Sequence, residues 1–446
     1  MNFTSTRLPY RQTNAFSRIA LDYIDQSEEL KSFFAHPPSL QGIQKAIEAR
    51  KQFSTDRKTL VQELTKQYEG VETSDKVKQN ISALLSADTF TVTTAHQNNL
   101  FTGPLYFIYK IIHAIKLAEH LNTTIPHQRF VPVFYIGTED ADLDELNHIW
   151  LGGEKLVWET KQTGAVGRMK IDKTLLKLID RMEGELSVLS NGAAIISQLR
   201  MFYAEGTTIQ DATFRFVNHL FSDYGLVILL PDNAALKKQM IPLFEDDLLH
   251  QTPSTIVENT TKRLMDAGYK VQANPREINL FYLEGDIRER IVRQGTSYKA
   301  IGTGLDLGED EIKKELHQHP EHFSPNVILR GLYQETILPN IAFIGGAGET
   351  AYWLQLIDLF VHYKIPFPVL VLRNSFLIAE KKWKEKIALT GFSLEDFFLS
   401  EVELMKRLVM KESKNPVKLN GSINEVEKIY ETYRRQDTGV DRKLEK

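Results

Sequence analysis

Residues 91–110, TVTTAHQNNLFTGPLYFIYK, contain the strand–helix junction on which the predicted fold rests. The β-branched run at residues 91–94 predicts a buried strand. Thr102 suits an N-cap, Gly103 lets the backbone approach a ligand closely, and Pro104 suits the first helical position, where no N–H is needed. Because the first N–H groups of a helix attract negative charge, we expect an anion site here. An ordinary turn of an α/β core is the alternative.

Three polar side chains, His96, Gln97 and Asn98, lie in the loop of this junction. Imidazole can transfer protons near neutral pH, and an amide can both donate and accept hydrogen bonds. The loop therefore combines a candidate proton shuttle with groups that can bind a polar ligand.

The composition is that of a globular protein and limits the classes of partner. Of the 446 residues, 42% are hydrophobic and 25% charged, and a chain of this length is expected to form more than one substructure. With a net charge of −4 and no long basic tract, neither nucleic acid nor a membrane is predicted as a main partner. No run approaches the roughly 18 apolar residues of a spanning helix, and no apolar signal core follows Met1, so we expect a cytoplasmic protein. The absence of cysteine excludes disulfides, thiolate metal ligands and a cysteine nucleophile.

Apolar segments that alternate with helical segments predict an α/β fold with a mostly parallel sheet covered on both faces. The strands are expected at residues 90–94, 130–136, 226–230, 340–344 and 368–372, and the helices between them at residues 104–121, 211–224, 234–249 and 349–363. Further helices are predicted before the first strand, at residues 14–25, 41–68 and 75–85.

Two regions interrupt this alternation and are interpreted as insertions that rim a cleft. Residues 150–205 begin with a hairpin at residues 150–171 and continue as helices. Residues 263–305 include small antiparallel strands at residues 278–303. Both belong to a core domain predicted at residues 1–388.

The C-terminal segment, residues 389–446, is charged and predicted helical. Ile423, Val426, Tyr430 and Tyr433 are spaced by 3, 4 and 3 residues, which is typical of the seam of a short coiled coil. Because one or two heptads are not stable alone, we expect either a partner chain on this seam or a truncated coiled coil.

An acidic loop follows the second predicted strand, in FYIGTEDADLDELNH (residues 134–148). Glu139 and Asp140 come first, at the sheet edge where ligands of α/β proteins bind. They suit a cation, a substrate amine or an amino sugar. For the later acids, an N-cap at Asp142 or Asp144 in a solvated loop is the alternative. Their irregular spacing does not predict a metal site.

A polar helical face is predicted in the first half of residues 324–356, SPNVILRGLYQETILPNIAFIGGAGETAYWLQL. Ser324 is expected to cap the helix. Asn326, Arg330 and Gln334 recur every four residues and therefore lie on one face, which lines a cleft or faces solvent. Arg330 suits a substrate carboxylate, because guanidinium binds carboxylates through two hydrogen bonds.

The glycine-rich loop GGAGETA, residues 345–351, supports an alternative function. Gly346, Gly348 and Ala351 match the dinucleotide fingerprint G-x-G-x-x-A, which would make the protein an NADP-dependent oxidoreductase. Glu349 opposes this interpretation, because its charge in the first helical turn would repel a pyrophosphate. The next strand ends in Arg373 instead of the usual acid, although an arginine fits a 2′-phosphate.

Without a nucleotide, the same loop suits a substrate amine. The Glu349 carboxylate at a helix start would bind the amino group, and Tyr352 and Trp353 would supply apolar walls.

Several of these motifs together resemble the bacillithiol biosynthesis cysteine-adding enzyme family, BshC. The resemblance covers most of residues 1–410, in consistent order. It rests on TAHQNNLFTGPLYFIYKI, VPVFYIGTEDADLDELNH, TGAVGRM, YGLVILLPD and the whole of residues 324–356.

The resemblance implies a Rossmann-like core related to class I aminoacyl-tRNA synthetases, with two connecting-peptide insertions and a C-terminal coiled coil that forms a homodimer. The implied reaction is the last step of bacillithiol synthesis. A ligase would form a carbon–nitrogen bond between the carboxyl group of cysteine and the amine of glucosaminyl malate. A chain without cysteine suits such an enzyme, because no side chain can form a mixed disulfide with substrate or product.

The resemblance also implies roles for the candidate residues. Residues 96–106 would occupy the place where the synthetases hold nucleotide phosphates, and Thr102 with Gly103 would bind a phosphate or a carboxylate. Arg330 would bind malate. The expected catalytic residues are His96, Glu139 and Asp140, and the expected substrate-binding residues are Gln97, Thr102, Gly103, Tyr106, Asn326, Arg330, Gln334, Gly345, Gly346, Glu349, Tyr352 and Trp353.

The sequence departs from the synthetase pattern at the residues that would bind an activating nucleotide. The lysine-rich signature of the synthetases has no clear counterpart in RNSFLIAEKKWKEK, residues 373–386. ATP or another nucleotide is therefore expected only from the amide-forming reaction class, and no metal is predicted.

Overall fold

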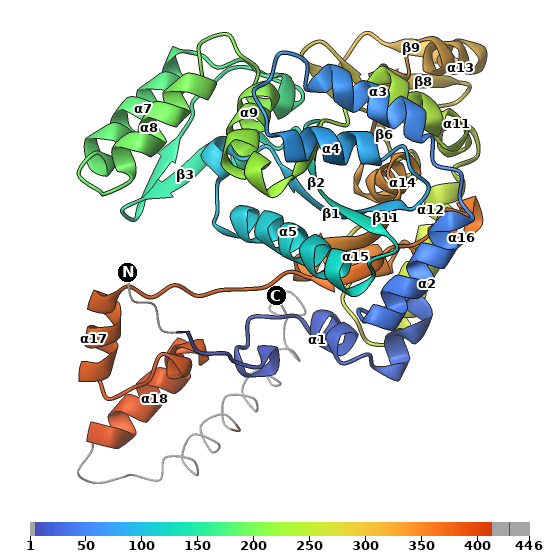
Figure 1. The fold of residues 1–446 in the computed structure, drawn as a ribbon. Coiled ribbons are helices and arrows are strands. Elements are labelled where there is room, and N and C mark those ends of the chain that lie inside the picture. Colours follow the sequence, from blue (N-terminus) through green and yellow to red (C-terminus); the bar gives the residue numbers. More distant parts are fainter. Residues whose placement is uncertain (1–4, 413–427, 429–446) are drawn as a thin grey trace, which may run out of the picture. The chain divides into compact units, whose positions relative to one another are not determined.

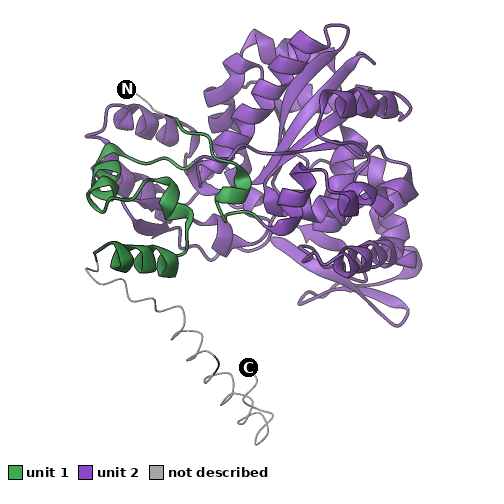
Figure 2. Cartoon of the chain, turned by 90° about the horizontal axis from the view of Figure 1, so that it is seen from below, with its two compact units in different colours: residues 1–16, 377–446 green, residues 17–376 purple. Residues whose placement is uncertain are grey.

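The computed structural model describes residues 5–412 and residue 428. The chain divides into two compact units, which Figure 2 colours separately. The larger unit comprises residues 17–376 and contains every predicted site residue. The smaller one combines residues 1–16 with residues 377–446.

The larger unit is organised around a five-stranded parallel sheet, in the order β12-β11-β1-β2-β5 (Figure 1). Its strands are β1 (Thr89–Gln97), β2 (Arg129–Gly137), β5 (Val227–Leu229), β11 (Asn340–Gly345) and β12 (Val369–Leu372). All five predicted strands are present, which confirms the α/β fold class. The order of the strands reverses between β1 and β11, and such a reversal opens a crevice at the carboxyl ends of the strands.

The β-branched run of β1 is buried because helices cover both faces of the sheet. The hydroxyl groups of Thr91 and Thr93 donate to Asn340 Oδ1 at 3.1 and 2.8 Å, so the polar atoms of this strand are paired within the core. Apolar residues of β1, such as Phe90 and Val92, cluster with side chains of α2 (Leu40–Lys51) and α5 (Tyr106–Thr124).

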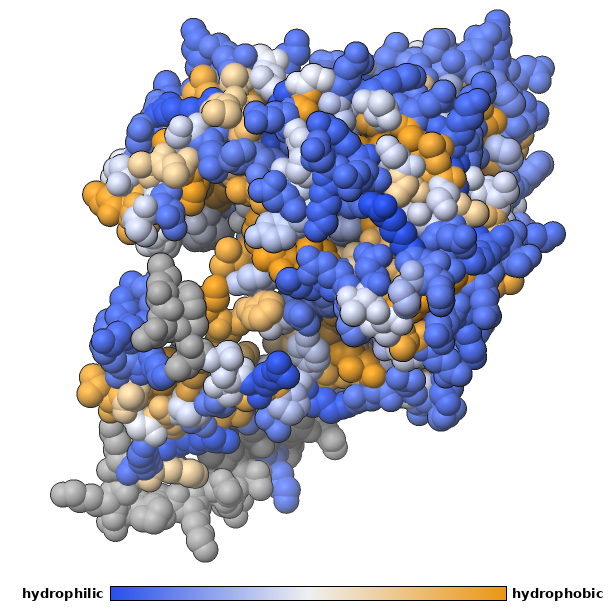
Figure 3. Space-filling view, in the orientation of Figure 1, coloured by the Kyte–Doolittle hydropathy of each residue, from blue (hydrophilic) through white to orange (hydrophobic). Residues whose placement is uncertain are grey.

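The remaining helices of the larger unit surround the sheet and its insertions. They are α1 (Arg18–Ile24), α3 (Arg57–Gln67), α4 (Asp75–Ala83), α6 (Leu143–Leu146), α7 (Lys173–Leu186), α8 (Gly192–Phe202), α9 (Ile209–Phe221), α10 (Ala234–Lys237), α11 (Ile241–His250), α12 (Thr252–Asp266), α13 (Glu309–Gln318), α14 (Val327–Ile337), α15 (Ala347–Leu354) and α16 (Ile357–Tyr363). Short 3₁₀ helices are η2 (Glu28–Phe33), η3 (Leu100–Thr102), η4 (Val166–Arg168), η5 (Ser222–Tyr224), η6 (Lys238–Met240) and η7 (Pro320–His322). Hydrophilic residues predominate on the visible surface around α3 and α4 in Figure 3.

The first long helix of the sequence is broken in two. The prediction of a single helix at residues 41–68 was wrong, because α2 ends at Lys51 and α3 begins at Arg57. The Asp56 carboxylate accepts a hydrogen bond from Thr59 N at 3.0 Å. Asp56 therefore acts as an N-cap that starts a new helix instead of continuing the old one.

Helix α5 begins later than its sequence predicts. Phe101, Thr102 and Gly103 have φ angles of 52°, 75° and 59°, all in the left-handed region. An N-cap residue requires an extended backbone, so Thr102 cannot cap α5, and the first helical residue is Tyr106 instead of Pro104. The predicted helix start at Thr102 was therefore wrong, whereas binding of a phosphate or a carboxylate by Thr102 and Gly103 stays a prediction. Two consecutive non-glycine residues in this conformation mark a strained loop.

Both predicted insertions contain the expected elements. The hairpin is formed by β3 (His148–Leu151) and β4 (Glu154–Val157), and α7 and α8 follow it. The second insertion contributes most of an antiparallel sheet in the order β10-β6-β7-β8-β9. Its strands are β6 (Leu280–Glu284), β7 (Ile287–Gln294), β8 (Ser297–Ala300), β9 (Asp306–Gly308) and β10 (Phe323–Pro325).

The smaller unit is helical where it is described. It contains η1 (Tyr10–Gln12), α17 (Lys381–Leu389), η8 (Glu395–Phe398) and α18 (Glu401–Glu412). The predicted coiled-coil seam at Ile423, Val426, Tyr430 and Tyr433 lies outside the described residues. Among the helices that the structure describes, none has both the length and the apolar character needed to cross a membrane.

Candidate functional site

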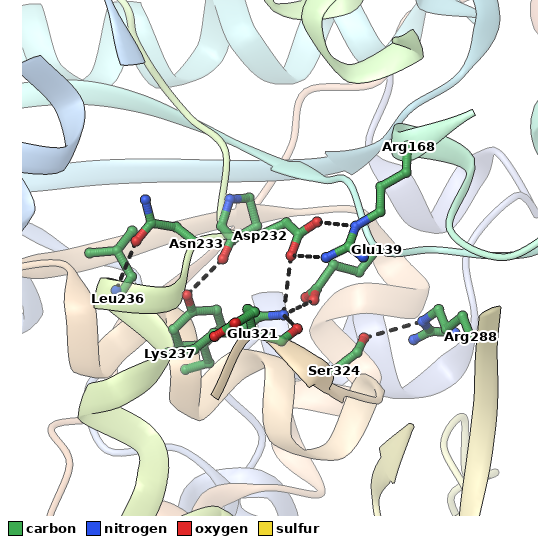
Figure 4. Close-up of polar contacts among 11 residues, drawn as sticks. Glu139, Arg168, Asp232, Asn233, Leu236, Lys237, Arg288, Glu321 and Ser324 are labelled. Atoms are coloured by element: carbon green, nitrogen blue, oxygen red, sulfur yellow. Dashed lines mark hydrogen bonds and ion pairs between the residues drawn. The ribbon is translucent and has the colours of Figure 1, made fainter. Parts of the chain in front are cut away.

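The candidate site lies where the carboxyl ends of β1, β2, β5 and β11 meet. His96 and Gln97 end β1, Glu139 and Asp140 follow β2, and Gly345 ends β11. Sequence segments that are far apart thus place their polar residues at one edge of the sheet. Figure 4 shows part of this edge, with an ion pair from Arg168 of the first insertion to Asp232 and a hydrogen bond from Arg288 of the second insertion to Ser324.

A buried ion network holds the ends of β2 and β5 together (Figure 4). Lys237 of α10 is fully buried, and its Nζ contacts Glu139 Oε1 and Asp232 Oδ1, the latter at 3.3 Å. It also donates to the carbonyl oxygen of Glu321 at 3.0 Å. Arg168 of η4 binds Asp232 with two hydrogen bonds, of 2.7 and 2.9 Å. The three N–H groups of Lys237 thus have three oxygen partners.

This network changes the interpretation of Glu139. Its side chain is 7% exposed and already paired with Lys237. Burial raises the pKa of Glu139, and the nearby Lys237 charge offsets part of this effect. A carboxylate that is buried and paired in this way connects elements of the fold, so a direct role with substrate would require the pair to loosen.

Asp140 is more accessible and links β1, β2 and α14. Gln97 Nε2 donates to Asp140 Oδ2 at 2.9 Å, and Arg330 Nη1 lies 3.7 Å from the same oxygen. Burial raises the pKa of Asp140, but the Arg330 charge and the Gln97 hydrogen bond outweigh it, so the pKa is lowered. Asp140 therefore stays ionised at neutral pH. For Arg330, burial is likewise outweighed by Asp140, and its pKa is raised.

His96 is a neutral imidazole in a crowded part of the site. Burial lowers its pKa well below the ordinary value, and the charges of Lys110 and Arg373 lower it further. Its ring lies 5.3 Å from the ring of Tyr106 and 5.5 Å from that of Phe107. Among the described residues, Nε2 has no hydrogen-bond partner. His96 thus carries an unprotonated nitrogen at neutral pH, as a general base requires.

Glu349 occupies the N-terminus of its own helix. Its Oε2 accepts a hydrogen bond from Gly346 N at 2.8 Å and lies 2.7 Å from Lys110 Nζ. Lys110 is buried, and its Nζ also donates to the carbonyl oxygen of Ala95 at 2.5 Å. The carboxylate therefore stands where a dinucleotide would place its pyrophosphate. The oxidoreductase alternative has no support in this geometry.

Two tyrosines lie beside these charged groups. The guanidinium of Arg373 is 5.0 Å from the ring centre of Tyr106, which is 38% exposed. Burial raises the pKa of Tyr352, and the charges of Glu349 and Arg330 also act on it. Both residues are near the predicted site, as expected.

Three other predicted residues have structural partners instead. Asn326, not Ser324, caps α14 by accepting from Ile328 N at 2.8 Å, and Ser324 lies in β10. Gln334 donates to the buried Glu335 at 2.9 Å. Trp353 is buried against Phe343, with ring centres 4.6 Å apart, so it is a core residue and not a cleft wall. Of the three residues predicted on the polar face of α14, Arg330 alone contacts the acidic loop within the described part of the chain.

Several buried polar atoms at the strand ends lack partners. Both side-chain polar atoms of Asn98 and the hydroxyl of Thr138 are buried without a hydrogen bond among the described residues. A side chain at Gly167 would come within 2.8 Å of Asn98 Nδ2 and 2.4 Å of the Thr138 carbonyl oxygen, so only glycine fits between them. Unpaired buried groups of this kind are rare and occur preferentially at functional sites.

Among the described residues, one group of side chains has ligand atoms close enough to bind a metal ion. His319, Glu321 and His322 offer atoms within 4.8 Å of one another. Each imidazole already has a carboxylate partner: His319 Nδ1 lies 3.2 Å from Glu321 Oε1, and His322 Nδ1 lies 2.6 Å from Glu315 Oε1.

Sequence reasoning did not identify Lys237, Asp232, Arg288 or Lys110 as site residues. Asp232 follows a core strand, β5, just as Glu139 follows β2, so the strand-end argument applied to it equally. Lys237 and Lys110 lie within helices whose charged residues are mostly solvated. Arg288 lies in β7, IRERIVRQ, where alternating charges indicate no particular partner.

Comparison with known proteins agrees with these motifs. The model of the family described as bacillithiol biosynthesis BshC, N-terminal Rossmann-like domain, matches residues 1–374. A relative from Flavobacterium johnsoniae is 41% identical over 92% of this chain and 78% of its own length. Relatives from Flavobacterium psychrophilum and Cytophaga hutchinsonii are 42% and 36% identical, over 89% and 99% of this chain and 75% and 83% of their own.

All three relatives have the name "Putative cysteine ligase BshC". The match extends over the parallel sheet, both insertions and every residue of the candidate site. The chain therefore belongs to the BshC family of bacillithiol biosynthesis proteins.

Proposed function

We propose that the protein is a ligase that joins the carboxyl group of cysteine to the amine of glucosaminyl malate and thereby forms bacillithiol. Family membership and the shared name of the relatives support this reaction. The structural observation that carries the proposal is the contact of Gln97, Asp140 and Arg330 at the strand ends. There an ionised carboxylate and a guanidinium lie side by side.

This pair of charges suits the two substrates. Glucosaminyl malate presents an amine together with carboxylates, and cysteine presents both groups. Asp140 is ionised because its pKa is lowered, so it can hold an ammonium group before reaction. Arg330, which is only loosely paired with Asp140 at 3.7 Å, can turn its donors to a carboxylate.

His96 is assigned the role of proton acceptor. The sugar amine attacks the activated carbonyl carbon with its lone pair, the leaving group departs with its own electron pair, and the nitrogen gives up a proton. A neutral imidazole with an unpaired Nε2 is suited to accept that proton. Glu139 is assigned a positioning role through its ion pair with Lys237.

Amide formation requires an activated carboxyl group, and a nucleoside triphosphate would supply the activation. The glycine-rich loop does not fit a phosphate, because the Glu349 carboxylate occupies the N–H of Gly346. We therefore derive no step through a nucleotide. A common origin with class I synthetases and a homodimer through the C-terminal helices remain predictions.

A deletion strain tests this function in the cell. Loss of the gene should abolish bacillithiol and accumulate glucosaminyl malate, measured by mass spectrometry of derivatised thiols. Complementation with the wild-type chain should restore bacillithiol, whereas the Asp140→Asn variant should not. Unchanged bacillithiol in the deletion strain would contradict the proposal.

A further inference from the structure

Arg288 is a cation at the edge of the candidate site that forms no direct ion pair with any described residue. It belongs to β7 in the second insertion, and its guanidinium stacks over the ring of Phe281 at 4.0 Å. Its Nε donates to Ser324 Oγ at 3.2 Å (Figure 4). Among the described residues, no carboxylate lies within 4.0 Å of it. Stacking and one hydrogen bond thus fix the guanidinium without neutralising it.

Arg330 belongs to the same part of the site. Ser324, which accepts the hydrogen bond from Arg288, lies two residues before Asn326, the N-cap of α14, and Arg330 follows early in that helix. Burial, and after it the charge of Arg330, lower the pKa of Arg288 to about 10, so Arg288 remains charged at neutral pH. Of the N–H donors on the two side chains, only Nε of Arg288 makes a hydrogen bond to another described residue. Arg330 has one loose ion pair, to Asp140.

The donors that these two arginines leave without a partner among the described residues are not buried, so they are available to a ligand. The charge of Arg330 disfavours the charged form of Arg288, whereas Asp140 keeps the pKa of Arg330 raised. A carboxylate bound between them would remove this repulsion and satisfy the forked donors. The charges of Glu139, Asp140 and Glu289 also act on Arg288, but none of these carboxylates forms an ion pair with it. Glu139 is held by Lys237, and Asp140 by Gln97 and Arg330.

We infer that Arg288 and Arg330 together form a binding site for a dicarboxylate, the malyl part of the sugar substrate. This inference rests on the proposed function for the identity of the ligand. Arg288 would bind one carboxylate through its unused fork, and Arg330 would bridge the second carboxylate to Asp140. The amino sugar would then extend toward Asp140 and His96. Cysteine has a single carboxylate, which must react, so it suits this pair less well.

Direct binding of L-malate and of glucosaminyl malate to the purified full-length chain tests the inference by calorimetry. Arg288→Met and Arg330→Met should each weaken binding of both probes at least about tenfold, as expected for loss of charge-assisted hydrogen bonds. Arg288→Lys keeps the charge but loses the fork, so it should bind with intermediate affinity. A monocarboxylate, lactate, should bind more weakly than malate to the wild type and equally poorly to the variants.

The matched control is Arg293→Met. Arg293 lies on the same strand, on the face opposite to Arg288, and donates to the carbonyl oxygen of Gly295. It should leave malate affinity unchanged. Thermal unfolding of each variant identifies any that fails to fold. If Arg288→Met does not fold, the malate affinity of the Arg288→Lys variant tests the role of Arg288.

The outcomes separate the two claims. If Arg288→Met and Arg288→Lys bind malate like the wild type, or if the wild type binds neither probe, the dicarboxylate site is wrong. If malate binding depends on Arg288 but no bacillithiol forms, the site stands and the proposed function fails.

Discussion

The carboxylate of Glu349 caps its own helix, with Oε2 2.8 Å from the backbone nitrogen of Gly346. The G-x-G-x-x-A pattern at residues 346–351 therefore has a structural explanation that needs no nucleotide. The backbone N–H of Gly346 donates to the side chain of Glu349, three residues later, and Lys110 balances the negative charge of Glu349.

NADPH is accordingly expected not to bind. Titration of the chain with NADPH, followed by cofactor fluorescence, should give no saturable change at concentrations where a known dehydrogenase is saturated. Glu349→Gln removes the negative charge and serves as a second test, because it should not create a dinucleotide site either. Saturable binding to the wild type would restore the oxidoreductase interpretation.

Removing Lys237 should destabilise the fold strongly. Lys237→Met leaves the buried carboxylate of Glu139 without a cation, and breaking such a pair costs about 3–5 kcal/mol of the free energy of unfolding. The double variant Lys237→Met/Glu139→Gln should recover part of this loss, since Asp232 keeps Arg168. Urea unfolding measures both.

The exposed pair of Lys116 and Glu119 provides the control. Lys116→Met should leave the free energy of unfolding close to that of the wild type, because an exposed ion pair contributes little to stability. If Lys237→Met were as mild as this control, the buried network would not hold the strand ends as described.

Protonation of His96 should set how the reaction rate falls on the acidic side of the pH–rate profile. Because its pKa lies well below 6.5, the rate should stay constant as pH falls through 6.5 and decline only at lower pH, when the imidazole becomes protonated. His96→Ala should lower kcat roughly 10²-fold and remove this decline, as measured by steady-state rates across pH. Full activity in His96→Ala would exclude it as the base.

Asp247 should make stability depend on pH. It is buried, accepts hydrogen bonds from Asn279 N and Nδ2 at 2.6 and 2.9 Å, and burial raises its pKa to about 7. Between pH 3.8 and about 7 the unfolded state has lost this proton while the folded state keeps it. The contribution of Asp247 to the free energy of unfolding is therefore fully present below pH 3.8. It decreases as pH rises toward 7, by up to ~4 kcal/mol.

Asp247→Asn removes the titrating group and should flatten this part of the pH–stability curve. Urea unfolding at several pH values compares the two proteins. An equally steep curve in Asp247→Asn would assign the dependence to other groups.

The sequence predicted the sheet well because its strands are short apolar runs buried on both faces. It also located the edge of the sheet where the polar residues of β1 and β2 converge. The start of α5 was wrong because Thr102 and Pro104 have good helix-start propensities, whereas the observed left-handed run at Phe101 and Thr102 depends on tertiary packing.

Partners within the site were harder to predict than its location. The four-residue spacing of Asn326, Arg330 and Gln334 is present at α14, but among the residues that the structure describes only Arg330 of these three contacts the acidic loop. Asn326 and Gln334 instead form hydrogen bonds with Ile328 and Glu335 of the same helix. Lys237 lies in a helix and Arg288 in an insertion, and the fold sets the position of both. No local pattern therefore shows that Lys237 contacts Glu139 or that Arg288 contacts Ser324.

The most direct test of the account is synthesis of bacillithiol by the purified chain. The chain is incubated with isotopically labelled cysteine, glucosaminyl malate and, in separate reactions, ATP, another nucleoside triphosphate or none, and thiols are measured by mass spectrometry. The account predicts labelled bacillithiol, greatly reduced in the Asp140→Asn variant. Absence of labelled bacillithiol in all these reactions, or an unchanged yield with Asp140→Asn, would contradict the proposed reaction or its assigned site respectively.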